Sequence, residues 1–325
     1  MSVPATRASE YVPEFDTLRA FAALAVMMSH FTEDINFLLS RLGWLGVILF
    51  FCLSGYVITG ILLRCRDLQG SQSIWATLSR FYIRRALRIF PLYYFAIFLF
   101  LFILPSIRSN LLWFLLYAVN IGKVFGYSGT QGFVPLNHFW TLAVEEQFYI
   151  VWPFVILLLA SKFHIPACVF MITLAILSRI LLSNILDATP TAVQQLTFSC
   201  TDALGLGALF AVAESKYKNY PERLNLRAFQ LLSVFLPLAV LTYISASDRN
   251  LSMLGPTVFS LAFAPLIFLI AKHSGSVRLA PLRYAPITYL GRISYGLYVW
   301  HLPVMWAYGK LVSMCFGWDI LNRFP

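Results

Sequence analysis

Long apolar runs recur along this 325-residue sequence, and they constrain its fold more than any other feature. A transmembrane helix needs about 20 mostly apolar residues. Charged residues make up only 12% of the chain, against roughly 25% in soluble domains, so they are too few to cover a soluble fold of this size. A lipid-spanning β-barrel would instead alternate polar and apolar residues in segments of roughly ten. The sequence therefore predicts an all-α, polytopic integral membrane bundle.

Nine stretches are predicted to cross the membrane, and no internal repeat divides them, so we expect a single membrane domain. A tenth apolar patch, Leu111–Val119, is too short to cross unaided and leads into a glycine-rich stretch, so we expect it to be re-entrant or to lie in the interface. The bundle is thus expected to have about nine to ten transmembrane helices. The nine predicted spans are 15–32, 43–63, 89–104, 139–160, 166–184, 196–213, 228–246, 252–271 and 287–312.

The charge of the loops predicts the orientation. The net charge of +10 is concentrated between the second and third, the sixth and seventh, and the eighth and ninth spans. With nine spans these three loops lie on one side, which the positive-inside rule assigns to the cytoplasm. The excess of basic residues is therefore read as loop charge and not as nucleic-acid binding. Residues 1–14 are expected to be a cytoplasmic segment without a cleaved signal peptide, and residues 313–325 a short tail outside.

Ionisable side chains inside a span cost about 2.5–3.5 kcal/mol each on insertion scales, so they are functional candidates. In the first span, Arg19 and His30 are eleven residues apart and share one helix face, about 16 Å from each other. Two interpretations are open. Arg19 could pair with Asp16 at the cytoplasmic end while His30 lies at the outer interface, or both could belong to a site.

Arginines and carboxylates give two further candidates. Arg80, Arg84 and Arg88 follow one another at intervals of four residues, beside Arg85. They could anchor the helix to anionic lipid, or they could bind phosphate, which suits the planar fork of arginine. The adjacent Glu145 and Glu146 lie early in a span, so at least one should face the protein interior, in a catalytic role or as a hydrogen-bonding link between helices.

The ninth span carries a polar stripe, since Ser294, Tyr298 and His301 lie at positions i, i+4 and i+7. An aromatic belt would explain the tyrosines but not the histidine.

The five cysteines are scattered without metal-ligand spacing, so we expect neither a disulfide framework nor a metal site.

Five segments resemble, in this order, motifs of the membrane acyltransferase-3 family: FDTLRAFAALAVMMSHF, GVILFFCLSGYVI, FYIRRALRIFPLYY, FWTLAVEEQFYIVWP and GRISYGLYVWHLPV. The resemblance extends from Phe15 to Pro303, within an expected transmembrane domain of residues 15–312. It implies an integral-membrane O-acyltransferase that moves an acyl group, mostly acetyl, from acyl-coenzyme A to a hydroxyl of a cell-envelope carbohydrate. The implied partners are acetyl-coenzyme A, a carbohydrate or lipid-linked glycan and membrane lipid. The implied location is the bacterial inner (cytoplasmic) membrane, and no metal or nucleic acid is expected.

The resemblance also implies roles for individual residues. His30 would be the general base or a transient acyl carrier, two possibilities that the sequence leaves open. The segment around Asp202 also looks like a family stretch. The implied catalytic residues are His30, Arg19 and Glu145; Arg85 and Arg88 would bind the donor; and Ser294, Tyr298 and His301 would line the acceptor side.

Two other functions are compatible with these residues. A proton-coupled transporter or flippase could use His30, Glu145 and His301 as a relay. A non-catalytic membrane scaffold is the second alternative. Family members have a further helix after the segment that corresponds to the ninth span, and this sequence stops at Pro325, so the last family helix is expected to be missing.

Overall fold

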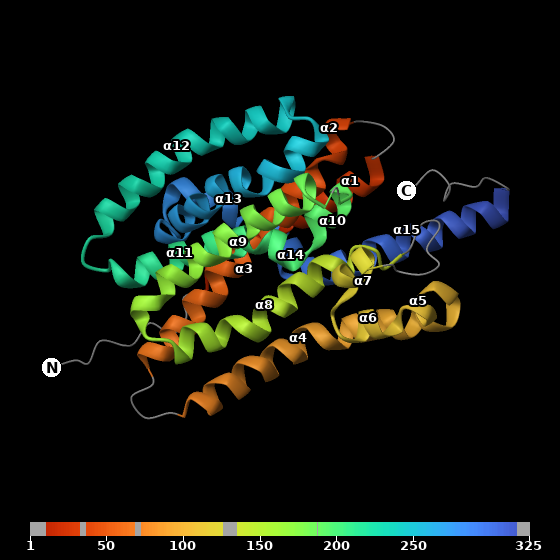
Figure 1. Cartoon of the computed structure of the whole chain (residues 1–325), viewed down its shortest axis with the longest axis horizontal. Helices are drawn as coiled ribbons and strands as arrows, with labels where there is room; N and C mark the ends of the chain where they lie inside the picture. The colour runs from red at the N-terminus through yellow and green to blue at the C-terminus, as the bar shows by residue number, and fades with distance from the viewer. Residues whose placement is uncertain (1–10, 33–36, 69–72, 126–134, 187, 317–325) are drawn as a thin grey trace.

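The computed structural model describes residues 11–32, 37–68, 73–125, 135–186 and 188–316, and all regular secondary structure in them is helical. Nine helices of 20 or more residues run along one long bundle (Figure 1). Each overlaps one predicted span, so the all-α class is confirmed. These helices are α1 (Pro13–Thr32), α3 (Leu42–Asp67), α4 (Ile74–Ile103), α8 (Phe139–Leu158), α9 (His164–Asn184), α11 (Thr197–Lys216), α12 (Pro221–Ser245), α13 (Asp248–Lys272) and α15 (Ser294–Phe316).

The ends of the chain differ from the prediction. The ninth predicted span is two helices, because the backbone breaks at Ile293 between α14 (Ala285–Arg292) and α15. Helix α15 then continues to Phe316, four residues into the predicted tail. Residues 1–10 of the predicted N-terminal segment and residues 317–325 of the predicted tail lie outside the described residues.

Six of these helices are long and apolar enough to cross a membrane, namely α3, α4, α8, α9, α12 and α13. The predicted number of nine to ten is therefore not confirmed by length and composition. Helices α1, α11 and α15 are long enough but carry more polar residues. Thirteen of the 20 residues of α11 are buried against protein, and a helix shielded from lipid can carry polar side chains without exposing them to hydrocarbon.

Helix α11 lies at the centre, where it packs against α3, α9 and α13. The backbones of α3 and α11 touch at two glycines: a Cβ on Gly55 would lie 2.1 Å from the carbonyl oxygen of Leu204, and one on Gly207 would lie 2.0 Å from that of Cys52. The Ser54-Gly55 pair thus marks close helix packing, as small residues in spans usually do. Helix α12 packs on α13 at one flank of the bundle, and α4 forms another (Figure 1).

Residues 105–125 fold back beside α4 and do not cross. They form α5 (Pro105–Ser109), α6 (Leu111–Leu115) and α7 (Val119–Phe125), each too short to span. The hydroxyl of Tyr93 donates to the carbonyl of Phe114 at 2.8 Å, ten residues before α4 ends. This contact is about 15 Å back along the helix. The prediction that Leu111–Val119 is too short to cross unaided therefore agrees with the short helices of the structure; residues 126–134 of the glycine-rich stretch lie outside the described residues.

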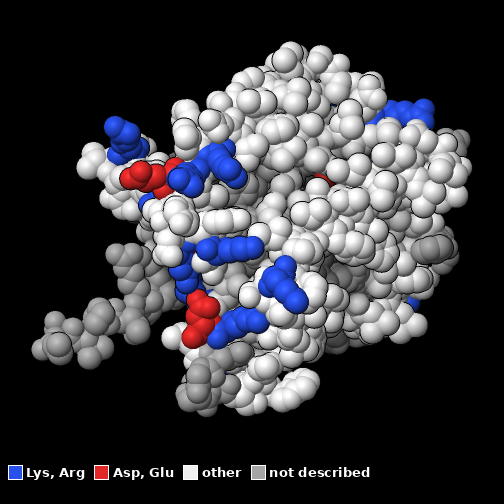
Figure 2. Space-filling model, turned by 60° about the vertical axis from the view of Figure 1, so that its left-hand side comes forward, with Lys and Arg blue, Asp and Glu red and all other residues white. Residues whose placement is uncertain are grey.

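The three basic loops meet at one end of the bundle. Lys218, between α11 and α12, pairs with Asp67 at the end of α3 at 3.1 Å, and Lys272 at the end of α13 lies 3.9 Å from Glu214. Figure 2 turns this end forward and shows Lys and Arg side chains gathered on it. We call it the basic end. The short elements not yet named are α2 (Phe37–Ser40) and α10 (Pro190–Gln195), with 3-10 turns at Ser161–Phe163 and Val277–Arg283.

Candidate active site

A cavity of about 520 Å³ opens among α3, α4, α8 and α15. We call it the inner cavity, because Cys65 and Thr77 at the basic end line it. Its other lining residues include most of the sequence-predicted site: Arg19, Arg85, Arg88, Glu145, Ser294 and Tyr298. Four helices that are far apart in the sequence, α1, α4, α8 and α15, thus bring these side chains together.

Helix α4 supplies the positive charge of the inner cavity. Arg80, Arg84 and Arg88 lie one turn apart on the helix, and Arg85 lies beside them, so all four reach the same cavity. The guanidinium of Arg85 lies 4.0 Å from the ring centroid of Tyr149 on α8. Stacking on an aromatic face leaves the edge of a guanidinium available for hydrogen bonds, and Arg84 and Arg88 remain exposed. Four arginines in one cavity favour binding of an anionic ligand.

Glu145 lies in the inner cavity and not beside His30. The hydroxyl of Ser54 on α3 donates to Glu145 Oε1 at 2.6 Å and lies 2.7 Å from the hydroxyl of Tyr149. His30 and Glu145, both implied to be catalytic by the family resemblance, line different cavities. Its neighbour Glu146 is buried, and its Oε1 has no hydrogen-bond partner among the described residues.

Arg19 is both paired with Asp16 and part of the inner cavity, so it fits both interpretations of its sequence position. Its Nη1 donates to Asp16 Oδ1 at 2.7 Å, which is the pair expected one turn apart on α1. Tyr11 also donates its hydroxyl hydrogen to Asp16. The Arg19 side chain nevertheless keeps 21% of its surface exposed and lines the inner cavity, so it is both ion-paired and accessible to a ligand.

A second cavity, of about 250 Å³, lies at the opposite end of the same helices. We call it the outer cavity. Gly43 and Trp44 at the start of α3 line it, whereas Cys65 near the end of α3 lines the inner one. His30 at the end of α1 lines the outer cavity, as its sequence position near a helix end predicted. Val47, Thr141 and Tyr298 line both cavities and form the boundary between them.

Three histidines gather at the outer cavity. His30 Nδ1 lies 3.2 Å from His301 Nε2, and the His138 ring centroid lies 4.6 Å from that of His301. We call His30, His138 and His301 the histidine group. His138 directly precedes the motif FWTLAVEEQFYIVWP, but sequence reasoning gave it no role because it precedes the predicted span. Its position next to that motif was the signal available.

The hydrogen bonds assign the tautomers of two of these rings. His301 Nδ1 lies 2.6 Å from the carbonyl oxygen of Tyr298, and because a carbonyl can only accept, Nδ1 carries the proton. Nε2 of neutral His301 is then an acceptor, so Nδ1 of His30 donates to it. The lone pair of His30 is left on Nε2. A histidine held in this way can take a proton from a hydroxyl at Nε2.

The polar stripe of α15 connects the two cavities. Ser294 lines the inner cavity, Tyr298 the boundary, and His301 contacts His30 in the outer group. The Tyr298 hydroxyl lies 2.6 Å from Thr141 Oγ1 and donates to the carbonyl of His138 at 3.3 Å. Seven residues of helix span about 10 Å, so this stripe carries polar groups from one cavity to the other.

Comparison with known proteins identifies the family of this chain. The acyltransferase domain model of the acyltransferase-3 family matches residues 12–320, nearly the whole chain. The chain belongs to the acyltransferase-3 family. The resemblance inferred from the five ordered motifs is thereby confirmed.

Relatives of this acyltransferase-3 chain include bacterial proteins named as O-acetyltransferases. It is 29% identical to the putative peptidoglycan O-acetyltransferase YrhL of Bacillus subtilis, over 92% of this chain and 49% of that protein. It is 28% identical to peptidoglycan O-acetyltransferase OatA of Listeria monocytogenes, over 91% and 50%, and 29% identical to O-acetyltransferase OatA of Staphylococcus aureus, over 91% and 51%. The chain spans about half the length of these relatives. No solved structure matches it.

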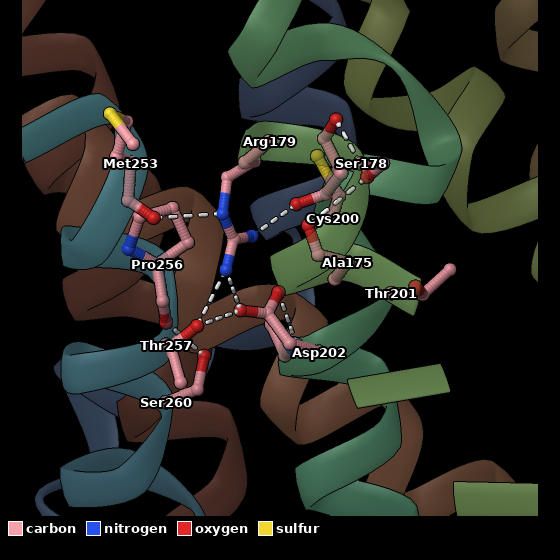
Figure 3. Close-up of polar contacts among 12 residues, drawn as sticks. Ala175, Ser178, Arg179, Cys200, Thr201, Asp202, Met253, Pro256, Thr257 and Ser260 are labelled. Carbon is pink, nitrogen blue, oxygen red and sulfur yellow. Dashed lines mark hydrogen bonds and ion pairs between the residues drawn. The ribbon is translucent and has the colours of Figure 1, made fainter. Parts of the chain in front are cut away.

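Asp202, which the family resemblance also singled out, belongs to another part of this acyltransferase-3 chain. Its Oδ2 accepts from Arg179 Nη2 on α9 at 2.7 Å and from the hydroxyl of Thr257 on α13 at 2.6 Å (Figure 3). Arg179 also donates to the carbonyls of Met253 and Ser199. We call this cluster the arginine node. Sequence reasoning did not single out Arg179, although it lies inside a predicted span.

The described residues contain no group of three or more His, Cys, Asp or Glu side chains placed to hold a metal ion. The histidine group is packed ring against ring, with His138 and His301 inclined at 62°. The arginines of the inner cavity could hold an anionic ligand, and the histidines of the outer cavity could move a proton.

Proposed function

We propose that this chain is an integral-membrane O-acyltransferase that moves an acyl group, most simply acetyl, from acyl-coenzyme A to a hydroxyl of a cell-envelope carbohydrate. One observation carries the proposal. A cavity lined by five arginines and a cavity lined by His30 and His138 lie at opposite ends of the same helices and share the boundary residues Thr141 and Tyr298. The names of the relatives, peptidoglycan O-acetyltransferases, suggest a carbohydrate of the bacterial cell wall as acceptor.

The inner cavity would bind the donor. Coenzyme A carries phosphates, and Arg85 and Arg88 present planar forks that suit phosphate oxygens. Arg19 would contact the donor from another wall of the cavity, because it lies on α1 and not on α4. Glu145, held by Ser54, would keep Tyr149 and the stacked Arg85 in place. In this role Glu145 is a positioning residue and not a partner of His30.

The chemical step would take place at the boundary. The acceptor hydroxyl oxygen attacks the thioester carbonyl carbon, His30 Nε2 takes the hydroxyl proton, and the carbon–sulfur bond breaks to release coenzyme A. The sulfur leaves as thiolate and takes up the proton that His30 received, directly or through water, so the base is regenerated and atoms and charges balance. His301, whose Nε2 accepts from His30 Nδ1, would orient the base and stabilise its protonated form. Tyr298 would lie between donor and acceptor.

The experiment uses the purified protein in lipid nanodiscs with acetyl-coenzyme A and cell-wall glycan fragments. The proposal expects release of free coenzyme A thiol that depends on the glycan, together with a glycan whose mass increases by one acetyl group. The double variant Arg85→Ala/Arg88→Ala should lose donor binding. Movement of a glycan precursor across the membrane without consumption of acetyl-coenzyme A would instead support a transporter.

We further propose that the basic end faces the cytoplasm of the bacterial inner membrane. Two native cysteines lie at opposite ends of the bundle: Cys65 near the end of α3, and exposed Cys315 near the end of α15. In single-cysteine proteins a membrane-impermeant maleimide should label Cys315 in intact cells and Cys65 only in inverted vesicles. Labelling of both from one side would contradict the proposed orientation.

A further inference from the structure

The lining of the outer cavity differs in chemistry from that of the inner one. Arginines and glutamates line the inner cavity, whereas no Asp, Glu, Lys or Arg among the described residues lines the outer one. Its polar groups are two histidines and neutral side chains, namely Ser29, Ser40, Asn137, Thr141, Gln194, Gln195 and Tyr298. A charged ligand would meet no opposite charge among the described lining residues, and burying an unpaired charge is costly. The cavity therefore favours an uncharged ligand with several hydrogen-bonding groups.

Two tryptophans give the outer cavity an apolar wall. Trp44 on α3 and Trp140 on α8 both line it, with ring centroids 5.7 Å apart and planes inclined at 42°. Trp140 is 8% exposed and supports Trp44, which is only partly buried. A tryptophan face is apolar and weakly negative, so it suits a flat ring edged with C–H groups. A pyranose sugar combines such a face with hydroxyls around its rim.

Polar atoms with unused hydrogen-bonding capacity line the same cavity. Both ring nitrogens of His138, a residue only 3% exposed, have no hydrogen-bond partner among the described residues, nor does the buried Oε1 of Gln195. A buried polar atom left unpaired costs free energy, about 1–3 kcal/mol. Such atoms persist in binding sites because a ligand satisfies them.

We propose that the outer cavity binds one uncharged sugar ring, stacked on Trp44 and hydrogen-bonded by His138 and Gln195. This inference rests on the function proposed above and names its acceptor chemistry. The volume of about 250 Å³ lies below the roughly 300–1,000 Å³ of sites for drug-sized molecules, so it fits a single ring and not a longer stretch of glycan. His30 lines the same cavity and would receive the proton of one ring hydroxyl.

The test compares three methyl glycosides that differ in charge: N-acetylglucosamine, glucosamine with its ammonium group, and glucuronic acid with its carboxylate. Saturation-transfer NMR measures their binding in nanodiscs, and coenzyme A release measures their use as acceptors. A second arm attaches the uncharged sugar to a polyprenyl diphosphate, which distinguishes a lipid-linked source from a free one. Saturable binding of the uncharged sugar in either arm, at least tenfold tighter than the charged analogues, supports the proposal; equal or absent binding of all three overturns it.

Two variants test the residues. Trp44→Leu should weaken sugar binding about tenfold while Trp44→Phe keeps most of it, and Trp75→Leu, a 69% exposed tryptophan at the other end, should change nothing. Gln195→Leu should weaken sugar binding by a similar factor and leave the thermal midpoint of the sugar-free protein equal or higher, because it removes an unpaired polar atom. Lower stability of Gln195→Leu with unchanged sugar binding would make Gln195 structural and overturn its role.

These results separate the inference from the function on which it rests. If acetyl-coenzyme A is neither bound nor consumed with any acceptor, the proposed function fails. If coenzyme A is released with some other acceptor while the uncharged sugar does not bind and Trp44→Leu has no effect, the acyltransferase remains and the sugar site is wrong.

Discussion

The arginine node and the histidine group are both polar clusters inside an apolar bundle, but they differ in how far their hydrogen bonds are satisfied. In the node, Arg179 and Asp202 are 1% and 0% exposed, and Asp202 accepts at both oxygens, from Arg179 and Thr257 at one and from the Ala203 amide at the other. In the histidine group, His138 is nearly as buried, yet neither ring nitrogen is paired.

This difference separates structural from functional polar residues. A saturated cluster has no capacity left for a ligand, and a buried ion pair of this kind holds helices together: here α9, α11 and α13 (Figure 3). An unsaturated cluster costs stability until something binds. Both clusters contain ionisable residues, which cost free energy to place inside a membrane. That cost alone therefore does not identify a functional site. Variants in the two clusters can test whether the saturation of hydrogen bonds does.

The largest effect is expected at His30. His30→Ala should lower turnover by about 10²–10⁴-fold, the loss typical of a general base, while leaving donor binding and the thermal midpoint near those of the parent protein. The assay is coenzyme A release together with a thermal melt in detergent. His273→Ala, which changes an exposed histidine after α13, is the control and should keep full turnover. A folded His30→Ala protein with near-normal turnover would remove the histidine group from the mechanism.

The opposite pattern is expected at the arginine node. Arg179→Met leaves Asp202 as an unpaired buried charge, so it should destabilise the protein by about 3–5 kcal/mol. Turnover per folded molecule should change little. Because Met and Leu can replace a buried pair with apolar volume, the double variant Arg179→Met/Asp202→Leu should recover much of the stability. A double variant that is stable but inactive would show that the node takes part in catalysis. Saturation of hydrogen bonds would then not distinguish structural from functional polar residues.

These two clusters also show what sequence can and cannot predict. Each of the nine predicted spans overlaps a long helix, because apolar runs of sufficient length report directly on helices in a membrane bundle. The stripe Ser294, Tyr298 and His301 was predictable because its members share one helix. Contacts between helices were not predictable: Ser54 and Glu145 are 91 residues apart, and Arg179 meets Asp202 only through the packing of α9 on α11. His138 was missed because it lies one residue before its helix, where helical periodicity does not predict which way a side chain points.

An intermediate effect is expected in the inner cavity, which is lined by several arginines that are not fully buried. Arg85→Lys and Arg88→Lys keep the charge and lose the planar fork, so each should weaken acyl-coenzyme A binding by about 1.5–3 kcal/mol. Calorimetric titration of the donor measures this directly. Arg108→Lys in α5, an exposed arginine that does not line either cavity, is the matched control. Unchanged donor binding in both cavity variants would assign these arginines to lipid anchoring.

The smallest effect is expected at Glu14, which resembles the arginine node in its saturation but lies at the basic end. Its carboxylate accepts from the Ser274 hydroxyl at 2.7 Å, and from the Gly275 amide and the Arg283 guanidinium at 3.1 Å each. Burial alone would raise the pKa of Glu14, but these hydrogen bonds outweigh it and hold the pKa below its usual value of 4.5. A carboxyl with a lowered folded-state pKa stabilises the protein above the unfolded value, and this contribution is lost as the pH falls through the folded-state pKa.

Glu14→Gln should therefore lower the thermal midpoint at pH 7, and its difference from the parent protein should shrink as the pH is taken below 4.5, where the parent carboxyl becomes protonated as well. Melts at a series of pH values in detergent measure this difference. Turnover at neutral pH should be unaffected, because Glu14 lines neither cavity. A difference that stays constant with pH would mean that the shape of the side chain, and not its charge, holds the loop after α13 against α1. In that case saturation by hydrogen bonds would still mark a structural residue, but the charge on Glu14 would contribute nothing to it.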